Sequence, residues 1–167
     1  MFALRTLIFT VCMLLPITSA AALTLAEKAP DFSLAALDDK QKYSLADYGG
    51  QVVYVDFWAS WCGPCRQSLP SLDRLYRQLS HRGFMVLAIN VDAYSQDAKD
   101  FLKAYPVSYP VLRNESGSLP ATFGVKGMPT AFLIDKQGKV RRVHEGFRLG
   151  DEDIIRKEVL TLLQEES

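Results

Sequence analysis

Two cysteines with only two residues between them stand in the segment WASWCGPCRQSLP, at positions 58–70 of the 167-residue chain. They are Cys62 and Cys65, and Gly63 and Pro64 separate them. Thiols this close together could bind a metal ion, form a structural disulfide or carry electrons. The rest of the chain helps to decide among these three kinds of chemistry.

A metal site and a purely structural disulfide are both poorly supported. Structural zinc needs four ligands, and outside the N-terminal segment the chain adds only the distant His81 and His144. Covalent haem needs a histidine directly after the second cysteine, where this chain has Arg66. A disulfide that closes so short a loop restricts the unfolded chain little and therefore stabilises the fold little. The pair thus indicates electron transfer between dithiol and disulfide forms.

The predicted elements around the cysteines suit this chemistry. Residues 51–58, QVVYVDFW, are mostly apolar and β-branched, which predicts a buried strand. Apolar residues then recur at helical spacing, which predicts a helix that Pro70 should kink. Cys62 would lie where the strand ends and the helix begins, where unpaired amide groups stabilise a thiolate and lower its pKa. We expect Cys62 to be the exposed attacking thiol, and Cys65, one turn inside the helix, to resolve the mixed disulfide.

Strands and helices alternate along the remaining sequence, which indicates an α/β sheet. Residues 29–50 contain short apolar stretches and turns, which predict an extra hairpin at the sheet edge. Further strands are expected at 84–92, 130–135 and 140–147, and helices at 95–105 and 151–166. In the last helix the residues expected to face the core are Ile154, Ile155, Val159, Leu162 and Leu163.

The N-terminal segment differs in character from the rest of the chain. Arg5 is its only charge, an apolar run covers residues 7–15, and small residues follow Pro16. This pattern is typical of a secretory signal peptide. The apolar stretch is, however, only slightly shorter than the ~20 residues that span a membrane, so an uncleaved anchor stays an alternative.

We therefore expect residues 1–22 to be a signal peptide or anchor, and residues 23–167 to form one domain. Without Cys12 the domain keeps a single pair of cysteines, in a compartment that is oxidising. Lys plus Arg and Asp plus Glu are equal, at 19 each. This balance offers no basic surface for a nucleic acid.

Several segments resemble the thioredoxin superfamily. VDFWASWCGPC is similar to its active-site segment, Pro70 matches the proline of the following helix, and GMPTAFLID (residues 127–135) is similar to the segment with its cis-proline. APDFSL near the start of the domain, together with a strand–helix insertion at residues 91–123, resembles the secreted TlpA/ResA branch. The resemblance covers residue 27 to the C-terminus.

This resemblance implies a thioredoxin-like fold, with a central mixed sheet flanked by helices, an N-terminal β-hairpin extension and the strand–helix insertion. It implies a cis Met128–Pro129 bond against the cysteine pair, with backbone groups beside it that pair with an extended substrate segment. Trp61 is expected to offer an aromatic face to partners, whereas Trp58 is expected to pack. The residues expected to bind substrate are Trp61, Gly63, Pro64, Met128 and Pro129.

Asp56 is an acid within the apolar strand that precedes the cysteines. Alternation could point its side chain to solvent, but a carboxyl buried among Val53, Val55 and Phe57 without a purpose would be costly. Thioredoxin has a buried acid at the matching place, which is thought to move protons for the second cysteine. Burial would raise the pKa of Asp56 and make it a usable base near neutral pH.

The sequence thus predicts a thiol-disulfide oxidoreductase, most simply a protein-disulfide reductase, without a cofactor or metal. We expect protein substrates with disulfides or thiols, and precursors of cytochrome c are one candidate class. We also expect a membrane thiol donor, a monomeric state and an extracytoplasmic location such as the bacterial periplasm. The alternatives are a disulfide oxidase or isomerase, and a copper carrier that uses the cysteines with His144. A peroxidase of the peroxiredoxin type would need a different pattern before Cys62 than Ala59, Ser60 and Trp61.

Overall fold

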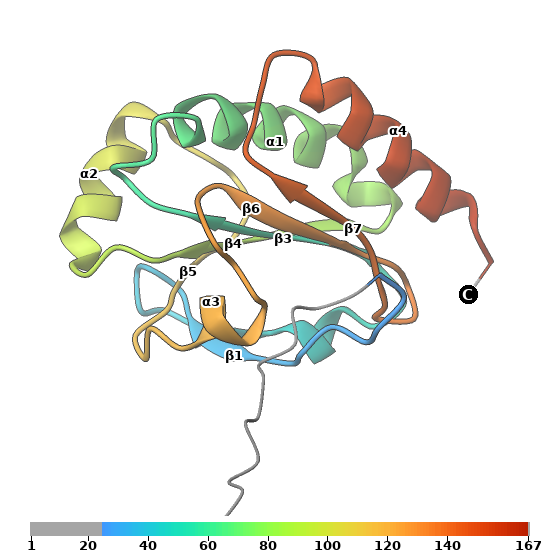
Figure 1. Cartoon of the computed structure of the whole chain (residues 1–167), viewed down its shortest axis with the longest axis horizontal. Coiled ribbons are helices and arrows are strands. Elements are labelled where there is room, and N and C mark those ends of the chain that lie inside the picture. The colour runs from blue at the N-terminus through green and yellow to red at the C-terminus, as the bar shows by residue number, and fades with distance from the viewer. Residues whose placement is uncertain (1–24, 167) are drawn as a thin grey trace, which may run out of the picture.

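The computed structural model describes residues 25–166, and the expected signal or anchor segment lies outside this range. A five-stranded mixed sheet forms its centre (Figure 1). In the order in which they pair, the strands are β5 (Val111–Arg113), β4 (Phe84–Asn90), β3 (Val52–Trp58), β6 (Thr130–Ile134) and β7 (Val140–Glu145). β3, β4 and β5 are parallel, and β6 is antiparallel to both β3 and β7. The ends of β3, β4 and β7 therefore lie at the same end of the sheet as the start of β6.

Three helices cover one face of this sheet (Figure 1). They are α1 (Cys65–Leu79), which contains Pro70, α2 (Ser95–Ala104) and α4 (Asp151–Gln164). Their inward side chains join those of the sheet in one apolar cluster, and both cysteines belong to it. The cysteine pair thus belongs to the apolar layer between the sheet and these three helices.

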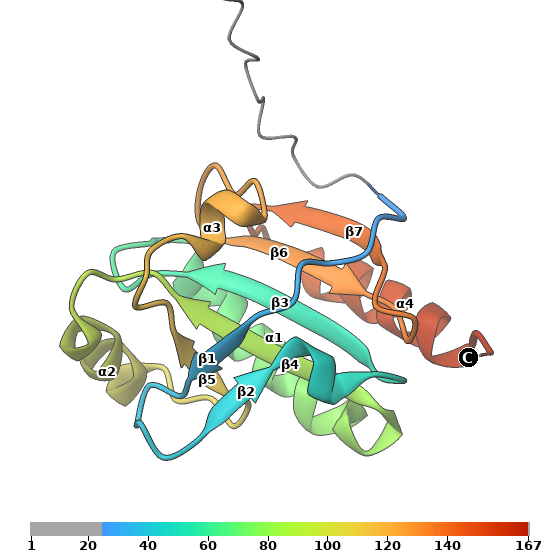
Figure 2. The same ribbon diagram turned by 90° about the horizontal axis from the view of Figure 1, so that it is seen from below.

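The opposite face is covered by a hairpin within residues 33–44 and by a short helix (Figure 2). The predicted hairpin is confirmed as β1 (Ser33–Ala35) and β2 (Lys42–Ser44), which form a sheet of their own. A bridge between Ala36 and Leu112 joins this hairpin to the edge strand β5. The short helix is α3 (Leu119–Thr122). The predicted strand–helix insertion is also confirmed, because α2 and β5 follow β4 and extend the sheet.

The central strand β3 is buried along its whole length, as its apolar sequence predicts. Its side chains alternate between the two faces. Tyr54 and Trp58 belong to the cluster under the three helices, whereas Val53, Val55 and Phe57 belong to the cluster under the hairpin. A strand with both faces covered needs this continuous apolar run.

The closing helix corrects one part of the sequence prediction. Ile155, Val159 and Leu162 are buried, and they follow the i, i+4, i+7 spacing of one helix face. Leu163 is half-buried. Ile154 was expected to face the core, but 54% of its surface is exposed. Ile154 comes one position before Ile155, where this buried face of the helix begins. Its side chain is therefore turned away from the sheet.

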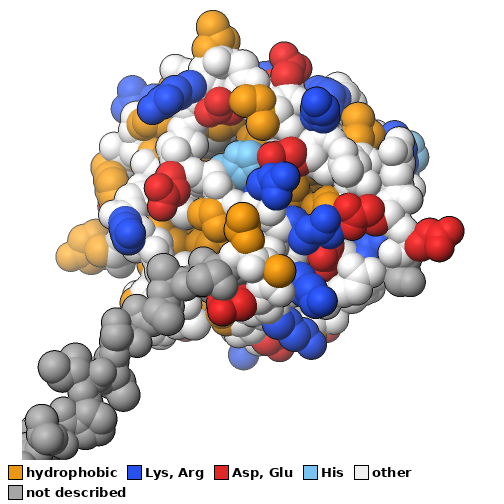
Figure 3. Space-filling model, turned by 45° about the vertical axis from the view of Figure 1, so that its right-hand side comes forward, with side chains coloured by type: hydrophobic (Ala, Val, Ile, Leu, Met, Phe, Trp, Pro, Cys, Tyr) orange, Lys and Arg blue, Asp and Glu red, His pale blue; other side chains and the backbone are white. Residues whose placement is uncertain are grey.

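The surface agrees with the balanced composition. On the face shown in Figure 3, basic and acidic side chains are interspersed among apolar ones. Within residues 25–166, none of the helices has the length and apolar character needed to cross a membrane.

Two short 3-10 helices complete the described chain. One, Leu45–Tyr48, follows the hairpin, and the other, Ser80–Arg82, continues α1. Gly83 then takes a left-handed conformation with φ of 91°, which lets the chain turn sharply into β4.

Candidate redox site

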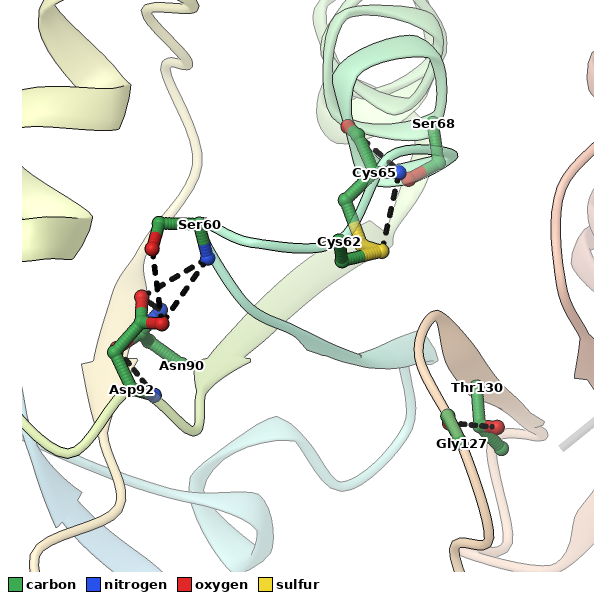
Figure 4. Close-up of a disulfide and its surroundings, with 8 residues drawn as sticks. All are labelled: Ser60, Cys62, Cys65, Ser68, Asn90, Asp92, Gly127 and Thr130. Atoms are coloured by element: carbon green, nitrogen blue, oxygen red, sulfur yellow. Dashed lines mark hydrogen bonds between the residues drawn. A yellow bond between two sulfur atoms is a disulfide. The ribbon is translucent and has the colours of Figure 1, made fainter.

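Cys62 and Cys65 form a disulfide at the point where β3 gives way to α1. Their Cα atoms are 5.3 Å apart. The helix begins at Cys65 with Pro64 as its N-cap, so Cys62 lies just before the helix rather than in its first turn. The backbone N–H of Cys65 points at Cys62 Sγ, with 3.2 Å between nitrogen and sulfur (Figure 4). An amide donor aimed at this sulfur would stabilise a thiolate there once the disulfide is reduced.

The exposure expected for Cys62 is not found in this disulfide form. Only 3% of the surface of Cys62 is exposed, and Cys65 is fully buried. The physical reason is that the disulfide joins both residues to the apolar cluster under the helices, and Met128 packs against that cluster. The difference between the two cysteines in this form is thus one of position relative to the helix, not one of solvent exposure.

The loop before β6 carries the predicted cis bond, between Met128 and Pro129. Hydrogen bonds hold this loop from both sides. Thr130 Oγ1 donates to the carbonyl of Gly127 at 2.7 Å (Figure 4), and the N–H of Gly146 donates to the carbonyl of Pro129 at 2.8 Å. Both hydrogen bonds are accepted by residues next to Met128. The half-buried Met128 therefore lies between two residues that are held in place.

Asp56 is buried in β3, with 1% of its surface exposed. Neither carboxylate oxygen has a hydrogen-bond partner within residues 25–166. By strand alternation its side chain shares the face of Tyr54 and Trp58, under the helices. Burial without a partner disfavours the charged carboxylate and raises the pKa of Asp56 to about 8. The alternative in which Asp56 faces solvent is therefore wrong.

The other residues predicted for the site divide into exposed and buried groups. Trp61 is 69% exposed, and Gly63 and Pro64 are exposed beside it. Trp58 is fully buried with its ring against Phe101 at a centroid distance of 5.2 Å, which confirms that it packs. The topology thus brings the exposed residues of the cysteine loop and the cis-proline loop to one end of the sheet.

A polar network beside the cysteine loop was missed by the sequence analysis. The Asp92 carboxylate accepts the Ser60 N–H at 3.0 Å, the Ser60 hydroxyl at 3.0 Å and the Asn90 side-chain amide at 2.8 Å (Figure 4). The Cys62 N–H in turn donates to the carbonyl of Ala59. Asp92 therefore fixes the turn that leads into Cys62. The signal that could have found it is the polar Asn90-Val-Asp92 at the end of a buried strand that runs parallel to β3.

His144, the residue considered for copper, lies in β7 and not in a cluster of metal-binding groups. Its Nε2 is 2.8 Å from a carboxylate oxygen of Glu158 in α4. Within residues 25–166, no group of three or more His, Cys, Asp or Glu side chains is placed to hold a metal ion.

The sequence of residues 25–143 matches the AhpC/TSA family. The chain is 34% identical over 147 residues to the thiol-disulfide oxidoreductase ResA of Bacillus cereus. The match covers 80% of this chain and 84% of ResA. This chain belongs to the AhpC/TSA family, among its ResA-like thiol-disulfide oxidoreductases.

Solved structures place this ResA-like chain in the thioredoxin fold. A Chlorobium tepidum protein described as a thiol:disulfide interchange protein DsbE is 44% identical, with a TM-score of 0.81, and the match covers 85% of this chain and 99% of that chain. The exposed lipoprotein thioredoxin Etrx1 of Streptococcus pneumoniae is 35% identical, with a TM-score of 0.67, and the match covers 80% and 100%. The predicted superfamily, fold and redox enzyme class are confirmed.

The buried carboxyl of Asp56 predicts an unusual pH dependence of stability in this ResA-like enzyme. Its pKa is about 8 in the folded chain against an ordinary 3.8, so the folded state keeps a proton that the unfolded state loses between these values. Stability should therefore fall as pH rises through this window, by up to about 1.4 kcal/mol per pH unit. The Asp56→Asn variant should escape this loss. Its stability advantage, measured by urea unfolding of the oxidised protein, should grow by several kcal/mol between about pH 5 and about pH 8.

The matched control is Asp97→Asn, which changes an exposed acid in the first turn of α2. Its stability difference from the unmodified protein should be the same at both pH values. If the stability difference of Asp56→Asn is also the same at both pH values, burial does not raise the pKa of Asp56 as described above.

Proposed function

We propose that this protein reduces disulfide bonds of extracytoplasmic proteins through the Cys62–Cys65 dithiol. The observation that carries the proposal is the cysteine pair directly before α1, with the Cys65 amide aimed at Cys62 Sγ. Such an arrangement makes Cys62 the better nucleophile. The similarity to ResA and to DsbE-type proteins supports the same chemistry.

The reaction uses two exchange steps. In the first, the Cys62 thiolate attacks one sulfur of a substrate disulfide, a mixed disulfide forms, and the other substrate sulfur leaves as a thiolate that takes up a proton. In the second, Cys65 loses its proton and attacks Cys62 Sγ, which releases the second substrate thiol and closes the Cys62–Cys65 disulfide. Two electrons pass from the enzyme to the substrate. An external dithiol must then reduce the enzyme again.

Asp56 is proposed as the group that accepts the proton of Cys65. It is buried on the side of β3 that faces α1, where Cys65 lies in the same apolar layer. A pKa of about 8 is close to the ~8.5 of an ordinary thiol. Proton transfer between groups of similar pKa needs little driving force. An acid with an ordinary pKa would be a much weaker base.

Substrate binding is proposed for the exposed end of the sheet. Trp61, Gly63 and Pro64 offer surface next to the disulfide, and the cis Met128–Pro129 segment lies on the neighbouring strand end. An extended substrate segment would pair with the backbone of Met128 in the manner of an added strand. The hydrogen bonds at Gly127 and Pro129 support this role because they hold the loop in place before substrate binds.

The cellular setting is part of the proposal, and the N-terminal sequence and the relatives support it. Residues 1–22 are proposed to direct export or to anchor the domain 23–167, which places the active site outside the cytoplasm, such as in a bacterial periplasm. The similarity to a pneumococcal protein described as an exposed lipoprotein supports this location. A membrane thiol donor would supply electrons to a monomeric enzyme.

The two cysteines should behave differently when substituted or alkylated. With reduced protein near neutral pH, one equivalent of iodoacetamide should label Cys62 almost alone, because the Cys65 amide stabilises its thiolate. Cys62→Ser should lose disulfide reductase activity entirely. Cys65→Ser should still attack substrates, but it should stop at the mixed disulfide because nothing resolves it. Mass spectrometry of labelled peptides and of trapped adducts measures both results.

The opposite assignment of attacking and resolving cysteine would give a different pattern. Label found mainly on Cys65, or reduction of disulfides by Cys62→Ser, would contradict the proposed roles.

The direction of electron flow is predicted from the residues between the cysteines. Gly63 and Pro64 match the pair found in thioredoxin, whose potential is about −270 mV, whereas that of the oxidant DsbA is about −120 mV. Redox titration against glutathione should give a reduction potential near that of thioredoxin. A potential near that of DsbA would instead support the alternative function as a disulfide oxidase.

A further inference from the structure

The buried carboxyl of Asp56 has to exchange protons with solvent in the proposed reaction, although only 1% of its surface is exposed. Burial raises the pKa of Asp56 to about 8, so most molecules hold a proton there at neutral pH. This proton has to leave before Asp56 can accept one from Cys65, and the accepted proton has to leave afterwards. The mechanism therefore needs a route for protons between Asp56 and the surface.

One row of side chains runs across the sheet from Asp56 to its edge strand. Asp56 in β3 is paired with Ala131 in β6, and Ala131 is paired with His144 in β7. Paired residues of neighbouring strands share a face of the sheet, and Ala131 belongs to the cluster on the face that the helices cover. Two strand spacings, about 10 Å, separate the first and last residues of this row. Nothing larger than the methyl group of Ala131 stands between them in the row.

Tyr54 lies on the same face and reaches both ends of this row. Its ring centroid is 5.9 Å from that of His144. Burial raises the pKa of Tyr54 well above its ordinary value, and the charges of Asp56, Glu158 and Asp151 raise it further. These three carboxyls therefore lie close enough to act on the Tyr54 hydroxyl. A hydroxyl both accepts and donates, so it can take up one proton while it releases another.

The pair of His144 and Glu158 brings this row to the surface. His144 Nε2 is 2.8 Å from Glu158 Oε2, and the two side chains are 18% and 22% exposed. Arg142 Nε donates to the other carboxylate oxygen of Glu158 at 3.1 Å. A surface cavity of about 230 Å³ borders His144, and Arg148 and Asp151 are among its lining residues. Histidine is a side chain that proteins commonly use to shuttle protons.

The second buried tyrosine near Asp56 offers no such route. The charge of Asp56 also raises the pKa of Tyr109, after burial itself. The Tyr109 hydroxyl, however, donates to the carbonyl of Leu69 in α1 at 3.1 Å, and Tyr109 is only 4% exposed. Asp73, the next carboxyl that acts on Tyr109, accepts both the N–H and the hydroxyl of Ser108 at 2.6 Å. A carbonyl has no proton to pass on, so this side ends inside the protein.

We propose that protons pass between Asp56 and solvent through the Tyr54 hydroxyl and the Glu158–His144 pair. The Asp56 acid gives its proton to Tyr54, and Tyr54 gives its own to Glu158. Glu158 then gives a proton to His144, which releases one to water at the surface cavity, so every group on the route returns to its starting state and no electrons move. His144 and Glu158 do not touch the reacting sulfurs but act through Asp56. The inference rests on the proposed function, because it assumes that Asp56 takes the proton of Cys65.

The test is the stopped-flow reaction of reduced protein with one equivalent of 5,5′-dithiobis(2-nitrobenzoate), in which the second thionitrobenzoate released reports attack by Cys65. The variant is His144→Gln, whose amide can still bond Glu158 but cannot shuttle a proton. The second release should be one phase in the unmodified protein. In the variant it should split into a fast phase, from molecules whose Asp56 is ionised at mixing, and a phase at least about tenfold slower. The fast share should be about one tenth at about pH 7 and about nine tenths at about pH 9, as a pKa of about 8 requires.

Two further variants separate the proton route from structural damage. Arg142→Gln removes the other partner of Glu158 but keeps the imidazole, and its second release should stay one phase at both pH values. In His144→Ala, imidazole added to the solution should restore the single fast phase, because it can enter from the surface cavity.

The inference and the proposed function fail in different ways. A single fast phase in His144→Gln, or equal slowing at both pH values without rescue of His144→Ala by imidazole, would overturn the proton route while leaving the role of Asp56 intact. If Asp56→Asn kept the pH profile of the unmodified protein, Asp56 would not take the proton of Cys65, and the route would fail with that role.

Discussion

Burial of β3 on both faces is the constraint on which the rest of the molecule depends. All seven residues of this strand are buried, and its side chains enter both apolar clusters. The strand pairs in parallel with β4 and antiparallel with β6, so its end is held between two neighbours. The groups proposed to move protons and electrons at the reacting sulfurs lie on this strand or directly after it: Asp56 is within it, and the cysteine loop is at its end.

This central position explains how one short segment can be both rigid and reactive. The loop after β3 is fixed by Asp92 from the end of β4, and the neighbouring Pro129 loop is fixed by Thr130 and Gly146. These hydrogen bonds let the Cys65 amide stay aimed at Cys62 Sγ without a cost of ordering at each reaction. The same arrangement leaves the ends of the strands open on one side, where apolar loop residues can meet a substrate.

Much of this could be predicted from sequence because the signals are local. The Cys62–Cys65 spacing, the apolar run of β3 and the Met128–Pro129 dipeptide each fit within a few residues, and burial of Asp56 follows from its apolar neighbours. The features that sequence missed depend on contacts between distant segments. The bond from Asp92 to Ser60 joins two strands, the low exposure of Cys62 depends on packing around the disulfide, and the exposure of Ile154 depends on how α4 is rotated on the sheet.

The most direct test of the central claim, that the buried Asp56 carboxyl takes the proton of Cys65, is the pH dependence of the resolving step. Reduced protein mixed with 5,5′-dithiobis(2-nitrobenzoate) should release one thionitrobenzoate as Cys62 attacks and a second as Cys65 resolves, so stopped-flow absorbance separates the two steps. In the unmodified protein the second rate should rise with pH to a midpoint near the pKa of Asp56, about 8. Asp56→Asn should slow the second step near neutral pH and lose this midpoint, while the first step keeps its rate. Superimposable pH profiles of the second step in the two proteins would contradict the account.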